Sequence, residues 1–246
     1  MAYNRESIGI KNELQVAWQG IQAAIKQMHP SSQTRPRSAS DIFSPDAGSS
    51  GPKFNVGPVV FHVPERANGS EPKLYVAISG WISFGAPLAS DPRRTTLQFG
   101  TQVGYFRVKG EQLVHIYGVH YDMDETLPGH PVFHAQMSSQ VGLGAEVSRL
   151  FRLQLDTGDD LPGALLRNVR TPTAQMDAFS VITQIGADHL VSEASGPEVH
   201  AAFAKLRDAC DFFMGAAGRL AYLSSLPATH CYRSTHWYTR SQPEVA

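Results

Sequence analysis

"LQFGTQVGYFRVKGEQLVHIYGVHYDM", residues 97–123, contains two runs of β-branched and aromatic residues on either side of the polar turn "VKGEQ". Such runs favour extended strands, and a short polar turn between them favours antiparallel pairing. Similar runs lie on both sides of this stretch: "VGPVVFHV" and "KLYVAISGWISF" come before it, and "PVFHAQM" comes after it. Consecutive strands with short connections predict an antiparallel β-meander of about five strands.

Helical periodicity brackets this meander. In "NRESIGIKNELQVAWQGIQAAIKQM", apolar residues recur at spacings of three and four, which places them on one helix face: Leu14, Trp18, Ile21, Ile25 and Met28. Towards the other end, "TPTAQMDAFSVITQIGADHLVSE" predicts a helix with Thr171 as N-cap and Pro172 at its first position. The segment "GPEVHAAFAKLRDACDFFMGAAGRLAYLSSL" carries the longest apolar stripe in the chain. We therefore predict an α+β fold with an N-terminal helix and a C-terminal helical pair.

The change in composition along the chain predicts three parts. Residues 1–28 form the N-terminal amphipathic helix. Residues 29–53, "HPSSQTRPRSASDIFSPDAGSSGPK", are rich in Ser, Pro and Gly and are expected to be a linker. Residues 54–240 form the α+β domain, with the β-meander over 54–140 and the helical part over 141–240.

The bulk composition excludes several classes of protein. Of the 246 residues 42% are apolar, so the chain has enough apolar surface to bury a core. The net charge of −1 does not indicate a nucleic-acid-binding protein, which would normally carry a basic excess. Two cysteines are too few for a disulfide scaffold. Neither an apolar leader nor a run of about 18 apolar residues is visible, so we expect a soluble, cytoplasmic protein with no membrane span.

One hairpin concentrates the chemically reactive side chains. The stretch "VHIYGVHYDMDETLPGHPVFHAQ", residues 114–136, holds four of the ten histidines and three acidic residues. Side chains alternate along a strand, so His120 shares a face with Asp122, and His130 shares one with His134. If Asp122 stands opposite His130, all four side chains lie on one surface, within reach of cross-strand and diagonal neighbours.

This set has the chemistry of a transition-metal site. Imidazoles and a carboxylate are ligands that zinc and similar divalent metals accept. We therefore predict His120, Asp122, His130 and His134 as metal ligands, with Asp124 as the acid–base group. A metal-bound water in such a site would hydrolyse a phosphoester or an amide, so the leading hypothesis is a metal-dependent hydrolase.

Two other interpretations of the hairpin stay open, because its spacing matches neither H-E-x-x-H nor a Cys/His finger. In a metal-free site, His120 oriented by an aspartate would act as general base and His134 as general acid. A phosphate substrate would then need a cation, for which Arg93, Arg94 and Arg107 are the nearest candidates in sequence. The hairpin could also be purely structural, with histidines on the half-exposed face of a sheet.

The alternative function is that of a non-enzymatic interaction protein. The amphipathic N-terminal helix could dock on a protein partner or exchange between copies of the chain in a homo-oligomer. The aromatic and basic tail "SLPATHCYRSTHWYTR", residues 225–240, could contribute to the same contact. This hypothesis places function in the two ends of the chain rather than in the histidine-rich hairpin.

Overall fold

The sheet is the centre of the molecule. The computed structural model describes residues 5–29, 33–35, 39–49, 51–63, 74–85, 94, 96–123, 133–137, 141–156, 169–173 and 175–211. Within these ranges nine strands form one sheet, in the order β1-β3-β4-β5-β6-β7-β9, with β2 also pairing with β3 and β8 with β6. All of the pairings are antiparallel except that of β8 with β6. The α+β class and the mostly antiparallel meander are therefore confirmed.

The elements have the following bounds. The strands are β1 (Gln33–Arg35), β2 (Phe43–Pro45), β3 (Lys53–Val63), β4 (Leu74–Phe84), β5 (Thr96–Lys109), β6 (Gln112–Met123), β7 (Phe133–Met137), β8 (Gln154–Asp156) and β9 (Arg170–Pro172). The helices are α1 (Arg5–Met28), α2 (Ala39–Ile42), α3 (Val141–Phe151), α5 (Ala178–Ile185) and α6 (Pro197–Asp211). A π-helical turn, η1 (Gly186–Leu190), continues α5.

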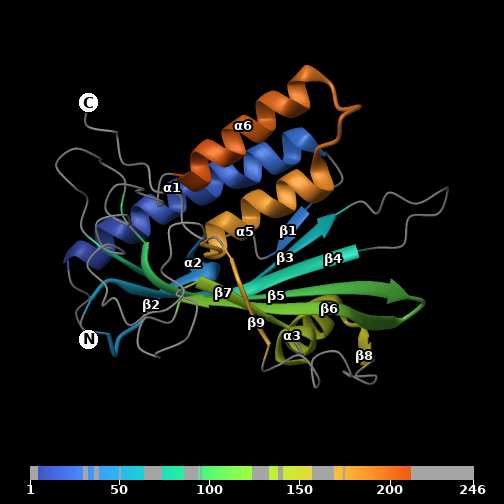
Figure 1. Ribbon diagram of the computed structural model, residues 1–246, viewed down its shortest axis with the longest axis horizontal. Helices are drawn as coiled ribbons and strands as arrows, with labels where there is room; N and C mark the ends of the chain where they lie inside the picture. The colour runs from blue at the N-terminus through green and yellow to red at the C-terminus, as the bar shows by residue number, and fades with distance from the viewer. Residues whose placement is uncertain are drawn as a thin grey trace.

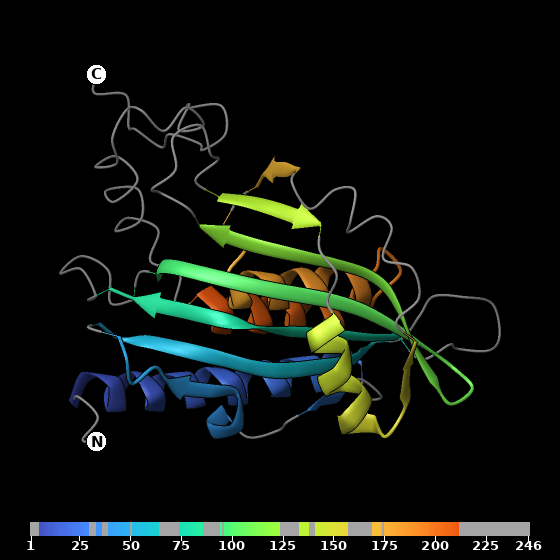
Figure 2. The ribbon, with the colours of Figure 1, turned by 90° about the horizontal axis from the view of Figure 1, so that it is seen from below.

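The two faces of the sheet are covered differently. Helices α1, α5 and α6 lie together on one face, and α3 lies on the other (Figure 1). The view turned by 90° shows α3 in front of the sheet and the other three helices behind it (Figure 2). We call these the three-helix face and the α3 face. Among the described residues, α3 covers one end of the α3 face (Figure 2).

The core on the three-helix face joins segments that are far apart in sequence. Trp18 of α1 packs edge-on against Phe43 at 6.2 Å and against Phe61 at 6.5 Å between ring centroids. Phe43 in turn stacks on Phe179 of α5 at 5.9 Å. The segment 29–53, expected to be a linker, thus includes β1, α2 and β2, and it places Phe43 in this core.

Helix α1 packs as its periodicity indicates. Its predicted stripe, from Leu14 to Met28, is between 0% and 4% exposed. The guanidinium of Arg94 adds an ion pair, with its Nε 2.7 Å from Oε2 of Glu13. None of the helices in the described ranges has an apolar run long enough to cross a membrane.

The first C-terminal helix begins later than expected. Thr171 and Pro172 lie in β9, at the sheet edge, where they pair with Ala135 and His134 of β7. Proline fits there because an edge strand can do without one backbone donor. The helix begins after Asp177, whose carboxylate accepts the backbone N–H of Ser180 at 2.9 Å. The predicted N-cap at Thr171 is therefore wrong, and an aspartate six residues later performs that role.

A β-bulge in β6 determines which of its side chains point to the α3 face. The pairing of β5 with β6 shifts between Tyr105 and Phe106, which leaves Ile116 as an extra residue on β6. The shift reverses the alternation, so Leu113 points towards α3 and packs with Phe106 and Val147. Without this bulge, Leu113 would face the three-helix side.

Gly80 of β4 permits a close approach of two strands. Its φ is +145°, and an added Cβ would overlap the carbonyl oxygen of Gly100 on β5. We expect Gly80→Ala to lower the free energy of unfolding by at least about 3 kcal/mol, through backbone strain and steric overlap. The control Gly110→Ala, also at positive φ but with open space around it, should cost about 1 kcal/mol. Urea unfolding followed by circular dichroism measures both, and equal losses would contradict the close approach.

Candidate functional site

Four residues on neighbouring strands form a line across the α3 face. Asp122 of β6 pairs with His134 of β7 on one side and with Gly100 of β5 on the other. Gly100 pairs in turn with Trp81 of β4. A Cβ added at Gly100 would lie 2.7 Å from the indole Nε1 of Trp81, so the indole leans over this glycine towards Asp122. The line brings an aromatic surface next to a carboxylate and an imidazole.

The carboxylate of Asp122 lies between two imidazoles. Its Oδ1 is 2.7 Å from Nε2 of His134, and its Oδ2 is 3.8 Å from Nδ1 of His120. The side chain of His134 is only 2% exposed, whereas those of His120 and Asp122 are 34% and 30% exposed. His134 therefore holds the carboxylate from the buried side, and His120 presents its imidazole towards solvent.

His120 favours its neutral form. Burial lowers the pKa of its imidazole and the neighbouring His134 lowers it further, while Asp122 acts in the opposite direction. A neutral imidazole can accept a proton or donate its lone pair to a metal at neutral pH. On either side it is flanked by an amide, since Gln102 on β5 and Gln136 on β7 are its cross-strand partners.

The structure joins part of the predicted site. His120, Asp122 and His134 share one face, as alternation predicts. The assumed pairing was wrong: Asp122 stands opposite His134, not His130. The displacement is four residues, and an even displacement keeps every side chain on its face. The predicted ligand His130 and the predicted acid–base residue Asp124 lie outside the described residues.

The three residues are not arranged as a metal site by themselves. Within the described ranges, no group of three or more His, Cys, Asp or Glu side chains could hold a metal ion. The predicted metal set, which includes His130, stays a prediction.

The other polar candidates take different positions. Arg94 is engaged with α1 through Glu13. Arg107 lines a cavity on the three-helix face, on the opposite side of the sheet from His120. Arg93 lies outside the described residues. The bulge does bring His115 to the α3 face, but its ring packs on Phe106, with 5.5 Å between centroids.

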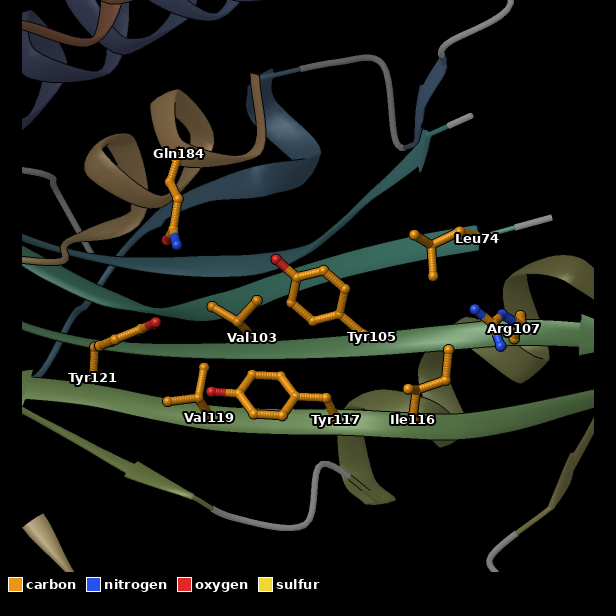
Figure 3. A pocket seen from close by; sticks show the side chains of 9 residues that line it. All are labelled: Leu74, Val103, Tyr105, Arg107, Ile116, Tyr117, Val119, Tyr121 and Gln184. Atoms are coloured by element: carbon orange, nitrogen blue, oxygen red, sulfur yellow. The ribbon is translucent and has the colours of Figure 1, made fainter. Parts of the chain in front are cut away.

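A cavity of about 350 Å³ lies on the three-helix face, between β5, β6 and α5. Figure 3 shows its lining, in which Tyr105, Tyr117 and Tyr121 stand out. The rings of Tyr105 and Tyr117 meet edge to face, with centroids 5.8 Å apart. Gln184 of α5 covers the cavity from the helical side. The cavity lies on the sheet face opposite the His/Asp cluster.

The tyrosines stay protonated to high pH. Burial raises the pKa of Tyr105 to about 12, and the carboxylate of Asp188 in η1 acts in the same direction. The pKa of Tyr121 is also raised to about 12, by burial first and then by Tyr117 and Asp188. The hydroxyls therefore serve as neutral hydrogen-bonding groups in a region of negative potential.

Sequence reasoning missed this tyrosine cluster. Tyr117 and Tyr121 are four residues apart on one strand, which is a signal that they share a face. Tyr105 joins them because it pairs directly with Tyr117 across the hairpin. The position of Gln184 of α5 at the cavity had no signal in the sequence.

Comparison with known proteins adds no relative. No family model, no curated protein sequence and no solved structure matches this chain.

The environment of His120 predicts its titration. We expect its pKa, measured by NMR, to lie below the ordinary value of 6.5, and Asp122→Asn to lower it further because the carboxylate favours the imidazolium. The variant Gln102→Ala, which changes a cross-strand neighbour without removing a charge, should leave this pKa nearly unchanged. A His120 pKa that rose in Asp122→Asn would contradict the arrangement.

The same shift affects stability. Because folding lowers the pKa of His120, the unfolded chain binds the proton more readily than the folded chain. This residue therefore lowers the free energy of unfolding as the pH falls from 6.5 towards the lower pKa of the folded state. Above 6.5 the cost is absent. Between about pH 7.5 and about pH 5.5, the free energy of unfolding measured with urea should fall less in His120→Gln than in the wild type.

Proposed function

We propose that the protein is a hydrolase whose reactive centre is the cluster of His120, Asp122 and His134. The proposal is carried by one observation, the carboxylate of Asp122 between a buried imidazole at 2.7 Å and a more exposed one at 3.8 Å. A carboxylate that orients an imidazole is a recurrent device for producing a general base. Here the more exposed imidazole faces solvent, where a substrate can reach it.

Each residue has a distinct task in this proposal. Asp122 faces Nδ1 of His120, which leaves Nε2 to take a proton from water or from another nucleophile. The lowered pKa of His120 keeps the imidazole neutral at the start of the reaction. His134, on the buried side, holds the carboxylate in position.

The neighbours of His120 favour an amide-type substrate. Gln102 and Gln136 flank the imidazole on the adjacent strands, and a side-chain amide can both donate to and accept from a peptide-like group. Trp81 adds an apolar surface along the same line. Arg94 and Arg107, the described arginines considered for a phosphate, are directed elsewhere. We therefore rank amide hydrolysis above phosphoester hydrolysis.

A divalent transition metal, zinc or a similar ion, would extend this centre. The predicted ligands are His120, Asp122, His130 and His134, with Asp124 as the acid–base residue. Neutral imidazoles and carboxylates are the usual ligands of catalytic zinc. A bound metal would supply an activated water, and the hydrolytic function would stay the same.

An interaction function, with a protein partner or a second copy of the chain, is the second candidate. The apolar stripe of α1 is buried within the chain, so an interaction would use the opposite side, where Ile8 is 52% and Val16 is 69% exposed. Two apolar side chains make a small contact. Sedimentation of an Ile8→Glu/Val16→Glu variant tests it, and an unchanged molecular mass would remove α1 as a self-association surface.

The hydrolase proposal predicts a loss of turnover in His120→Gln. We expect the purified protein to cleave an acyl p-nitroanilide, and the variant to lose on the order of 10²-fold in kcat because a general base contributes that much. His200→Gln is the matched control, since it makes the same substitution at an exposed histidine of α6, on the other face of the sheet. Bis-p-nitrophenyl phosphate and a p-nitrophenyl ester complete the panel, and preferred cleavage of the phosphate would overturn the amide assignment.

Metal content is measured on the same proteins. Inductively coupled plasma mass spectrometry should find a transition metal in the wild type that His120→Gln lowers and His200→Gln retains. Turnover without metal, abolished in His120→Gln, would support the metal-free form. Absence of turnover with and without added zinc would refute the hydrolase proposal in both forms.

A further inference from the structure

The polar groups of the tyrosine cavity converge at one end. Figure 3 shows the hydroxyls of Tyr105, Tyr117 and Tyr121 pointing towards a common region, with the amide of Gln184 above it. Each hydroxyl oxygen and the amide oxygen can accept a hydrogen bond. Each hydroxyl and the amide can also donate a hydrogen bond, so this end fits a polar group, and the charges around it decide which kind.

Charge favours a cation at the same end. The carboxylate of Asp188 acts on both Tyr105 and Tyr121, and it disfavours any further negative charge there. His189, which follows Asp188, contacts Tyr105 with 5.7 Å between ring centroids.

The rest of the cavity is apolar and ends at an arginine. Leu74, Val103, Ile116 and Val119 line it, and they fit a hydrocarbon or aromatic body. In Figure 3, Arg107 lies beside Leu74 and Ile116, away from the converging hydroxyls. A second positive charge on the ligand would meet this guanidinium, so a ligand with one cationic end is favoured.

We propose that this cavity binds a primary organic ammonium whose nitrogen lies among the three tyrosine hydroxyls and Gln184 and whose apolar body extends towards Leu74. A volume of about 350 Å³ accommodates a ring-sized ligand. The ammonium donates its three N–H groups to the oxygens, and Asp188 supplies the counter-charge. This function is separate from the hydrolase proposal, because the two sites lie on opposite faces of the sheet.

Three ring compounds of nearly equal size test this proposal. Benzylammonium carries the cation, benzyl alcohol is neutral and benzoate is an anion. Titration of the full chain by isothermal calorimetry near pH 7.5 should show benzylammonium binding at least about 10-fold more tightly than benzyl alcohol, and benzoate more weakly than both. Chemical shifts of Tyr105 and Tyr117 in an NMR titration should report the site.

Three substitutions distinguish an effect of the Asp188 charge from an effect on the fold. Asp188→Asn should weaken benzylammonium about 3-fold and leave benzyl alcohol unchanged, because only the cation feels the lost carboxylate. Asp208→Asn removes the same charge from a side chain of α6 that is 69% exposed, and it should change neither. Tyr105→Phe should weaken the cation by about the same factor as Asp188→Asn through the lost acceptor.

Other results would overturn the proposal. Equal or tighter binding of benzyl alcohol would make the cavity a neutral apolar site. Tightest binding of benzoate would assign the ligand preference to Arg107. No saturable binding of any of the three would show that the cavity is not a site for this class. Because His120 lies on the opposite face, His120→Gln should leave benzylammonium binding intact, which distinguishes this result from a failure of the hydrolase proposal.

Discussion

The register between β5 and β6 is the constraint on which the rest of the structure depends. Eleven consecutive positions of β6, from Gln112 to Asp122, pair with β5 or sit in its single bulge at Ile116. The bulge places Leu113 and Tyr117, which are four residues apart, on opposite faces, the first towards α3 and the second towards α5. A sheet packed on both faces tolerates only one such register, because a slip of one residue would place polar side chains in both cores.

Alternation along the same strand separates the two candidate sites. Tyr117, Val119 and Tyr121 point to the three-helix face and line the cavity there. His120 and Asp122, between and beside them, point to the α3 face and meet His134. Among the described residues, α3 covers one end of its face, and Gln184 of α5 lines the cavity on the other face. A single strand thus serves two chemically unlike surfaces.

The sequence predicted which site residues share a face of the sheet, but not which residues pair across the strands. Alternation alone placed His120 with Asp122, and it kept His134 on their face although the assumed partner, His130, was wrong. Pairing itself depends on the length of the connection and on packing, which local sequence does not encode. The predicted start of the first C-terminal helix was wrong for a similar reason. Thr171 has good capping chemistry, but the pairing of β9 with β7 places it in the sheet. The burial of Phe43 was not predicted, because the residues around it in sequence are rich in Ser and Pro, which is typical of a linker.

The sequence by itself determined the kinds of element, their order and the alternation of side chains, because these follow from periodicities of two and 3.6 residues that belong to each segment alone. It also determined that α1 has one apolar face. Only the tertiary structure decided which residues meet: Tyr105 with Tyr117, Asp122 with His134, and Asp188 with the tyrosines. These meetings depend on register, on one bulge and on the packing of helices far away in the chain, and they arise from the energy of the whole core rather than from any single segment.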